Sequence, residues 1–196
     1  DKNSDQNTDL PHMLVDKNTW EKIVSSMGIS NDDRIVVYDN SDVISSCRLW
    51  YNFIYFGHNP NLVHVLDGGL KKWKNENREV TNLSSKYISS HYSAKEISSL
   101  VKDKKQIYEN TNNNEFKVID ARSKERFEGK VKEPREGTRS GSIPESLCLP
   151  YTKLVNEDNS FKNKDEISKI FQQILGPEMT TNVIFTCGSG VTASVL

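Results

Sequence analysis

Short β-branched runs that alternate with helical segments are the feature that most limits what this chain can fold into. Residues 34–39 read Arg-Ile-Val-Val-Tyr-Asp, and residues 62–66 read Leu-Val-His-Val-Leu. Between them, residues 46–56 are rich in aromatic side chains and stop at Gly57, which is typical of a buried helix. A short helix through Trp73 follows the second run. Because parallel strands need helical crossovers, this part of the chain predicts a parallel sheet covered by helices.

The same alternation returns after a polar, serine-rich segment. We interpret this segment, residues 81–93, as a linker between domains covering residues 1–82 and 94–196. The long charged stretch at 130–142 is interpreted as a loop. Helices are expected over 16–27, 94–110 and 166–175, and strands over 116–120 and 182–186. The sequence therefore predicts two α/β domains.

Charge and cysteine usage narrow the classes of function. The chain has 26 basic and 27 acidic residues, a net charge of −1, and no large block of like charge. Nucleic acids and membrane surfaces are therefore poor candidates for partners, and no apolar run approaches the roughly 18 residues of a membrane span. Three widely spaced cysteines fit reduced thiols better than a disulfide framework. We expect a cytoplasmic protein.

One cysteine has a sequence context that indicates chemistry. Cys187 directly follows the strand expected over 182–186 and begins the sequence Cys-Gly-Ser-Gly-Val-Thr. Two glycines let successive backbone N–H groups turn inward and form an anion-binding nest, in which a thiolate is favoured. The alternative is a small buried side chain in an ordinary turn. Cysteine phosphatase chemistry is disfavoured, because Ala193 stands where such enzymes need an arginine.

The other two cysteines lack this context. Cys47 lies in an aromatic helix and Cys148 between two leucines, so both are interpreted as structural.

The two halves of the chain share a pattern. A strand that ends in a polar residue and leads into a Ser- or Gly-bearing loop occurs twice. It ends in Asp39 in the first half and in Cys187 in the second. This echo suggests a duplicated unit with a nucleophile in one copy only.

Several motifs together carry a resemblance that covers nearly the whole chain. The sequence from Cys187 to Ala193 resembles the active-site loop of the 3-mercaptopyruvate sulfurtransferases of the rhodanese superfamily. The other matching segments are residues 10–14 (Leu-Pro-His-Met-Leu), 66–70 (Leu-Asp-Gly-Gly-Leu), 119–122 (Ile-Asp-Ala-Arg) and 141–144 (Gly-Ser-Ile-Pro). The resemblance implies two tandem rhodanese-like domains, each a mostly parallel sheet flanked by helices. The first would be inactive and the second catalytic, and both would be truncated at their outer ends.

The resemblance also implies a reaction. Cys187 would take a sulfane sulfur from 3-mercaptopyruvate, or from thiosulfate, as a persulfide and pass it to an acceptor. The acceptor would be a thiol, such as that of thioredoxin, or cyanide. Such transfer needs a good thiolate and N–H donors for an anionic persulfide, with no metal and no organic cofactor.

Specific residues take roles by the same resemblance. Arg126 and Arg135 match the substrate-binding arginines, and paired guanidinium groups suit a carboxylate and a keto oxygen. Arg122 is expected to be structural. The residues of the loop that would bind substrate with them are Gly188, Gly190, Val191 and Thr192. A proton-handling triad would consist of Asp1, His12 and Ser189.

Two alternatives stay open at this point. The chain is interpreted as a thiosulfate:cyanide sulfurtransferase in one, and as a non-catalytic rhodanese-like interaction or regulatory module in the other. The neutral residues Gly188 and Ser189 favour 3-mercaptopyruvate over a small dianion as donor. An organellar matrix remains an alternative to the cytoplasm, because a targeting segment can precede Asp1.

Overall fold

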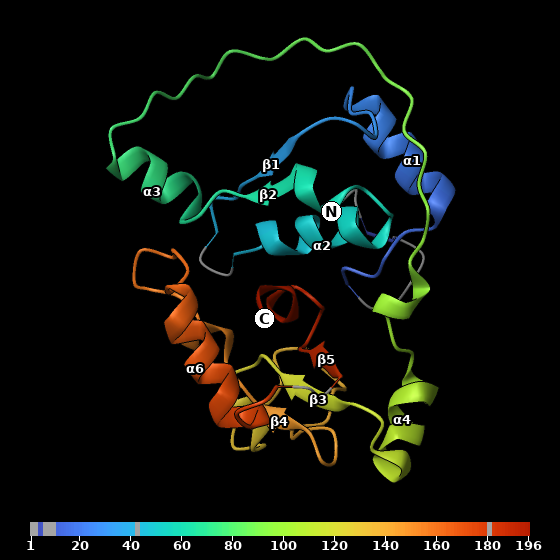
Figure 1. The fold of residues 1–196 in the computed structure, drawn as a ribbon, viewed down its shortest axis with the longest axis vertical. Helices are drawn as coiled ribbons and strands as arrows, with labels where there is room; N and C mark the ends of the chain where they lie inside the picture. The colour runs from blue at the N-terminus through green and yellow to red at the C-terminus, as the bar shows by residue number, and fades with distance from the viewer. Residues whose placement is uncertain (1–3, 6–10, 42–43, 180–181) are drawn as a thin grey trace. The chain divides into compact units, whose positions relative to one another are not determined.

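The chain folds into two compact units, Asp1–Val101 and Lys102–Leu196 (Figure 1). This computed structural model describes residues 4–5, 11–41, 44–179 and 182–196. Each unit contains a parallel sheet with helices packed against it. The α/β class predicted from the alternation of strands and helices is confirmed.

The first unit is built around the β-α-β-α pattern seen in the sequence. Its helices and strands are α1 (Lys17–Ser26), β1 (Ile35–Val37), α2 (Ser46–Tyr55), β2 (Val63–Val65) and α3 (Gly69–Asn75), with 3-10 turns at η1 (Pro60–Leu62) and η2 (Ser98–Leu100). The two strands pair in parallel, with Ile35 opposite Val63 and Val37 opposite Val65. Helix α2 makes the crossover between them, as parallel pairing requires.

An aromatic cluster forms the core of this unit. The ring of Trp20 on α1 stacks on Phe56 at a centroid distance of 4.7 Å and meets Phe53 edge-on at 5.1 Å. All three side chains are at most 2% exposed. Burying a large apolar side chain stabilises a fold by about 1.5–3 kcal/mol, so this cluster holds α1 and α2 together.

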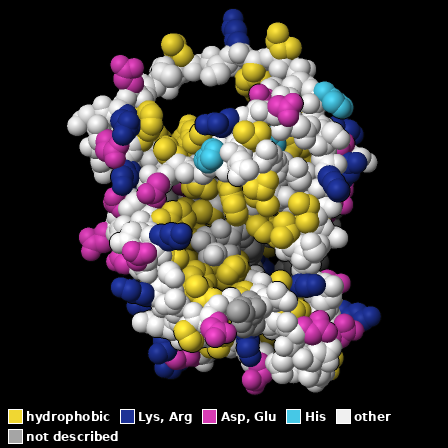
Figure 2. Space-filling view, in the orientation of Figure 1, with side chains coloured by type: hydrophobic (Ala, Val, Ile, Leu, Met, Phe, Trp, Pro, Cys, Tyr) yellow, Lys and Arg dark blue, Asp and Glu magenta, His cyan; other side chains and the backbone are white. Residues whose placement is uncertain are grey.

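The division between the units lies later than the linker that we expected at 81–93. Tyr92 and Ala94 are buried in the first unit's core, and the N–H of Ser90 donates a hydrogen bond of 3.0 Å to the carbonyl of Ser25. Earlier in the segment, Leu83 is 80% exposed. There the chain arches away from the body of the first unit (Figures 1 and 2). The polar composition of the segment thus corresponds to the arch. The end of the segment packs on the first unit because the ring of Tyr92 and the methyl group of Ala94 are buried in its core.

The second unit has a three-stranded parallel sheet in the order β4-β3-β5. Its elements are α4 (Lys104–Asn113), β3 (Lys117–Asp120), α5 (Lys124–Phe127), β4 (Leu147–Cys148), η3 (Tyr151–Lys153), α6 (Lys164–Leu175), β5 (Val183–Thr186) and η4 (Thr192–Val195). Asp120, at the end of the central strand β3, lies opposite Cys148 on one side and Thr186 on the other. Ile119, Leu149 and Leu154 form the core with the apolar side chains of α6.

The prediction of one helix over 94–110 is wrong. Residues 98–100 form only the turn η2, and α4 begins at Lys104. The reason is a capping box, in which the Asp103 carboxylate accepts the N–H of Gln106 at 2.8 Å and the Gln106 side chain accepts the N–H of Asp103 at 3.0 Å. The helix then continues beyond residue 110 to Asn113, and Asn114 after it adopts a φ of +52°. By contrast, the helix expected over 166–175 is confirmed and begins two residues earlier, after a capping box of Asn163 and Glu166.

Candidate active site

Cys187 lies directly after β5, at the edge of the second unit's sheet where the carboxyl ends of its parallel strands meet. This edge is where open α/β sheets bind their ligands. The loop from Cys187 to Val191 leads into η4, a 3-10 turn. The sheet thus positions the cysteine as the sequence predicted.

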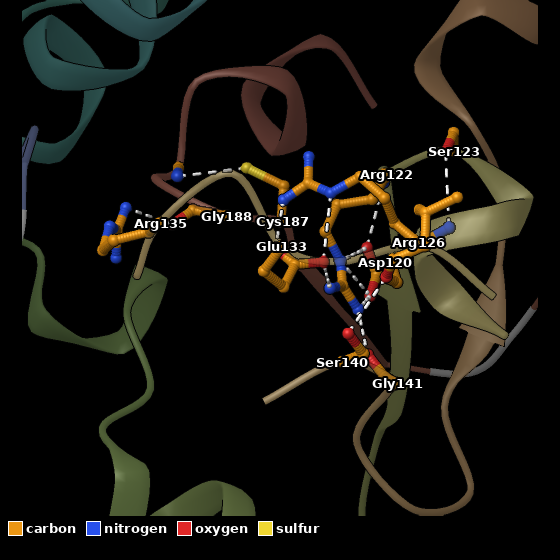
Figure 3. A network of polar contacts seen from close by, with 12 residues as sticks. Asp120, Arg122, Ser123, Arg126, Glu133, Arg135, Ser140, Gly141, Cys187 and Gly188 are labelled. Atoms are coloured by element: carbon orange, nitrogen blue, oxygen red, sulfur yellow. Dashed lines mark hydrogen bonds and ion pairs between the residues drawn. The ribbon is translucent and has the colours of Figure 1, made fainter. Parts of the chain in front are cut away.

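The loop surrounds the sulfur with hydrogen-bond donors. The backbone N–H of Gly190 donates to Sγ of Cys187 at 3.1 Å, and Gly190 adopts a φ of +78°, which favours glycine (Figure 3). Burial raises the pKa of the Cys187 thiol, but the Thr192 hydroxyl and the N–H groups of Ser189, Ala193 and Gly190 outweigh it. The pKa of Cys187 therefore lies below its ordinary value. A thiolate at this position is favoured.

The other two cysteines have the opposite chemistry. Burial, assisted by the charge of Asp39, raises the pKa of Cys47 to about 12. Burial and the charge of Asp120 also raise the pKa of Cys148. Only Cys187 has the environment of a nucleophile among the three.

Two arginines approach the Cys187 loop from other segments of the second unit. Arg135 donates a hydrogen bond from Nη2 to the carbonyl oxygen of Gly188 at 3.2 Å (Figure 3). Nη2 of Arg126, on α5, lies 3.1 Å from the point where a Cβ on residue 188 would stand. The absence of a side chain at Gly188 therefore lets the guanidinium of Arg126 approach the loop. Arg126 and Arg135, which the resemblance selected, therefore both lie beside Gly188, the residue that follows Cys187.

A buried ionic network supports Arg126. The Glu133 carboxylate accepts from Nε of Arg126 at 3.1 Å and from Nη1 of Arg122 at 2.9 Å. Arg122 in turn forks onto the Asp120 carboxylate, with Nε at 3.0 and 2.9 Å from its two oxygens, and donates to the carbonyl of Gly141 at 2.7 Å. Arg122 thus has the structural place that we expected.

Glu133 is a residue that the sequence analysis missed. It is an acidic residue in a segment rich in lysine and arginine, but Glu136 shares that property and is exposed. The sequence alone does not distinguish the two. Their difference arises only when α5 and the loop at 130–142 fold against each other.

The predicted triad draws on residues of both units. Ser189 lies in the Cys187 loop, partly buried, whereas His12 belongs to the first unit and has a φ of +60°. The carbonyl oxygen of His12 accepts a hydrogen bond from Nη2 of Arg48 at 2.7 Å. Asp1 lies outside the described residues. The triad therefore stays a prediction.

The corresponding loop of the first unit contains a carboxylate instead of a thiol. Oδ2 of Asp39, just after β1, accepts the N–H of Ser46 at the start of α2 at 2.8 Å. It also accepts the hydroxyls of Ser45 at 2.8 Å and Ser41 at 3.0 Å. A negative charge at a helix start is favourable. The first unit thus has its own anion where the second unit has Cys187.

Two further properties concern the described part of the chain. Within it, no group of three or more His, Cys, Asp or Glu side chains is arranged to hold a metal ion. In the same part, no helix has the length and apolar character needed to cross a membrane.

Comparison with known proteins identifies the family. Residues 5–76 and 103–196 match the rhodanese-like domain family. The chain belongs to the rhodanese family. This rhodanese chain consists of two rhodanese-like domains, as the resemblance predicted.

Individual relatives are similar along nearly all of the rhodanese chain. It is 34% identical over 195 residues to 3-mercaptopyruvate sulfurtransferase of Mus musculus, a match that covers 98% of the chain and 65% of the relative. It is 34% identical over 214 residues to thiosulfate/3-mercaptopyruvate sulfurtransferase 1, mitochondrial, of Arabidopsis thaliana, covering 98% of the chain and 56% of the relative. The rhodanese chain therefore spans less than two thirds of the length of these curated relatives.

A solved structure agrees with this assignment. SseA from Escherichia coli, whose crystal structure is described as having the rhodanese fold, superposes with a TM-score of 0.85 at 30% sequence identity. The match covers 98% of this rhodanese chain and 71% of SseA.

Proposed function

We propose that this chain is the sulfur-transferring part of a 3-mercaptopyruvate sulfurtransferase, with Cys187 as the nucleophile. The observation that carries the proposal is the Cys187 thiol, whose pKa is lowered by the N–H and hydroxyl donors of its own loop. The names of the mouse and Arabidopsis relatives support the same activity. The second unit is the catalytic one, and the first, with Asp39 in place of a thiol, is not catalytic.

The first step converts the thiolate into a persulfide. The Cys187 thiolate attacks the sulfur of 3-mercaptopyruvate, a sulfur–sulfur bond forms, and the carbon–sulfur bond breaks. The electron pair of the broken bond stays on carbon, which is protonated to give pyruvate, and the donor's own thiol proton balances this step. The sulfur is oxidised to the sulfane level while the carbon is reduced.

The second step returns the enzyme to its starting state. An acceptor thiol, for which thioredoxin is our candidate, attacks the outer sulfur and leaves with it as a persulfide, and the Cys187 thiolate is regenerated. Cyanide is the alternative acceptor, and thiocyanate its product. Both steps use no group beyond the donor, the acceptor and the protein.

The loop and the two arginines divide the work of binding. The N–H groups around Sγ stabilise the negative charge of the persulfide, with Gly188, Gly190, Val191 and Thr192 shaping the pocket. Arg126 and Arg135 bind the carboxylate and keto oxygen of the donor through paired hydrogen bonds. Ser189, His12 and Asp1 form the proposed triad that handles the proton.

The choice of donor follows from the loop's charge. Gly188 and Ser189 have no cationic side chain, so the loop is better suited to one negative charge than to the two of thiosulfate. Thiosulfate is the second candidate donor, because the Arabidopsis relative is named for both. A non-catalytic module is disfavoured, since such a module has no use for a thiol of lowered pKa beside two arginines. The reaction is assigned to a reducing compartment, the cytoplasm or an organellar matrix.

A single-turnover measurement tests this proposal. The full-length protein, mixed with excess 3-mercaptopyruvate and no acceptor, is expected to release about one equivalent of pyruvate in a burst, as an enzyme that forms a covalent intermediate does. The Cys187→Ser variant is expected to release none, and Cys148→Ser to behave as the parent. A folded parent protein that releases no pyruvate refutes the proposal.

A further inference from the structure

A buried carboxylate lies between two arginines in the candidate site. The Glu133 side chain is 4% exposed and accepts hydrogen bonds from Arg126 and from Arg122 (Figure 3). Arg126 contributes two of its nitrogens, Nε and Nη2, to this contact. The same guanidinium lies against Gly188, so Glu133 fixes the orientation of a group that faces the Cys187 loop.

The charges of this network cancel in pairs. Arg122, which is 11% exposed, is matched by the Asp120 carboxylate at the end of the central strand β3. Because Asp120 balances the charge of Arg122, the negative charge of Glu133 is left to balance the positive charge of Arg126. Two carboxylates and two guanidinium groups therefore sum to zero. Arg126 is thus held as an oriented hydrogen-bond donor within a network whose net charge is zero.

Arg135 is different. Its contact with the loop is to a neutral carbonyl oxygen, that of Gly188. Within the described ranges of the chain, no carboxylate forms an ion pair with Arg135. Of the two arginines beside the Cys187 loop, Arg135 is thus the one whose positive charge no ion pair in the described ranges cancels.

We propose that Glu133 determines donor specificity, as a positioning residue that holds Arg126 and cancels its charge. One net positive charge matches the single carboxylate of 3-mercaptopyruvate, whereas the dianion thiosulfate is bound less well by one charge than by two. Glu133 acts through Arg126 and does not itself contact the donor. This inference rests on the proposed function.

The test compares both donors on the Glu133→Gln variant of the full-length protein. The substitution keeps the shape of the side chain and removes its charge. The KM for 3-mercaptopyruvate is expected to rise, because a neutral amide holds Arg126 less firmly. The ratio of kcat/KM for 3-mercaptopyruvate to that for thiosulfate is expected to fall about tenfold, since one added positive charge favours the dianion. An unchanged ratio overturns the proposal.

Two control variants separate charge from position. Glu136→Gln removes the same charge from an exposed residue of the same loop and is expected to leave the ratio unchanged; a shift as large as that of Glu133→Gln overturns the proposal. Glu133→Asp keeps the charge but shortens the reach. It is expected to raise the KM for 3-mercaptopyruvate and to leave the ratio within about twofold of the parent, since only an altered charge separates the two donors.

Glu133→Asp also keeps the proposal testable if Glu133→Gln does not fold, which thermal unfolding measures. An Asp variant with the parent's KM for 3-mercaptopyruvate overturns the positioning role. The failure of the proposed function is distinguished by the parent protein. If the parent transfers sulfur from neither donor, the proposed function fails, whereas an active parent whose donor ratio is insensitive to Glu133 refutes this inference alone.

Discussion

The backbone N–H of Gly190 donates a hydrogen bond to Sγ of Cys187 at a distance of 3.1 Å. This contact depends on the φ of +78° at Gly190, which turns the loop back toward the sulfur. The conformation of the loop therefore contributes directly to the lowered pKa of the Cys187 thiol.

Gly190→Ala is expected to slow alkylation of Cys187 at neutral pH. A side chain in this left-handed conformation costs about 1 kcal/mol, and relief of the strain moves the N–H away from the sulfur and raises the pKa of the thiol. The pH dependence of iodoacetamide labelling at Cys187 measures this. Gly176→Ala is the matched control, because Gly176 has a φ of +90° and open space around it at the end of α6. Equal labelling profiles for the two variants contradict the assigned role of Gly190.

Arg126→Lys and Arg135→Lys are each expected to lower kcat/KM for 3-mercaptopyruvate by about 10- to 100-fold. Hydrogen bonds to charged groups are worth about 1.5–3 kcal/mol, and lysine cannot reproduce the planar fork of arginine. Steady-state kinetics measure the loss. The exposed Arg139, on the same loop as Arg135, provides the control, and Arg139→Lys is expected to retain the parent's value. The arginine assignment is wrong if all three variants behave alike.

Acid is expected to remove a stabilising contribution of Glu133. The hydrogen bond from Arg126 lowers the pKa of this carboxyl; burial opposes the change, and the charges of Arg126 and Arg122 add to it. Because the folded-state pKa is depressed, the contribution is complete above the unfolded value of about 4.3 and is lost as the pH falls through the folded value. The difference in unfolding free energy between the parent and Glu133→Gln is thus greatest near neutral pH.

Chemical denaturation at several pH values checks this expectation. The difference for Glu133→Gln shrinks on acidification below about pH 4 if the account is correct. For the exposed Glu136→Gln we expect a small difference at every pH. A difference for Glu133→Gln that grows in acid contradicts the ion pairing.

Asp39→Ala is expected to destabilise the first unit without affecting sulfur uptake at Cys187. The Asp39 carboxylate accepts the N–H of Ser46 at the start of α2, and no side chain at the N-cap position Ser45 does so. Loss of a helix cap costs about 1 kcal/mol. Thermal unfolding measures the change, with Asp32→Ala, at an exposed position of the same unit, as control. An Asp39→Ala protein as stable as the control shows that the carboxylate does not cap α2.

Local patterns in the sequence predict the fold class and the position of the nucleophile. The β-branched run at 183–186 and the glycines after it are adjacent in the chain, so a strand, a tight loop and an activated Cys187 can be inferred together. The start of α4 was missed because the side chains of Asp103 and Gln106, and not apolar periodicity, determine it. The two-residue strand β4 is too short to give a periodic signal.

The support of the site depends on contacts between segments distant in sequence. Glu133 lies seven residues after Arg126 and eleven after Arg122, but α5 ends at Phe127, so no regular helix or strand joins Glu133 to the two arginines. Their ion pairs form only when the loop at 130–142 folds over α5. Likewise, Arg135 and Gly188 are 53 residues apart. The resemblance to a family selected Arg126 and Arg135, but it gave no reason to select Glu133.

The intact mass of the full-length protein after exposure to 3-mercaptopyruvate tests the central claim most directly. The account predicts that the parent protein and Cys148→Ser each gain one sulfur atom, which a reducing thiol removes, and that Cys187→Ser gains none. A folded parent protein that gains no sulfur, or a Cys187→Ser variant that gains it as the parent does, would contradict the account.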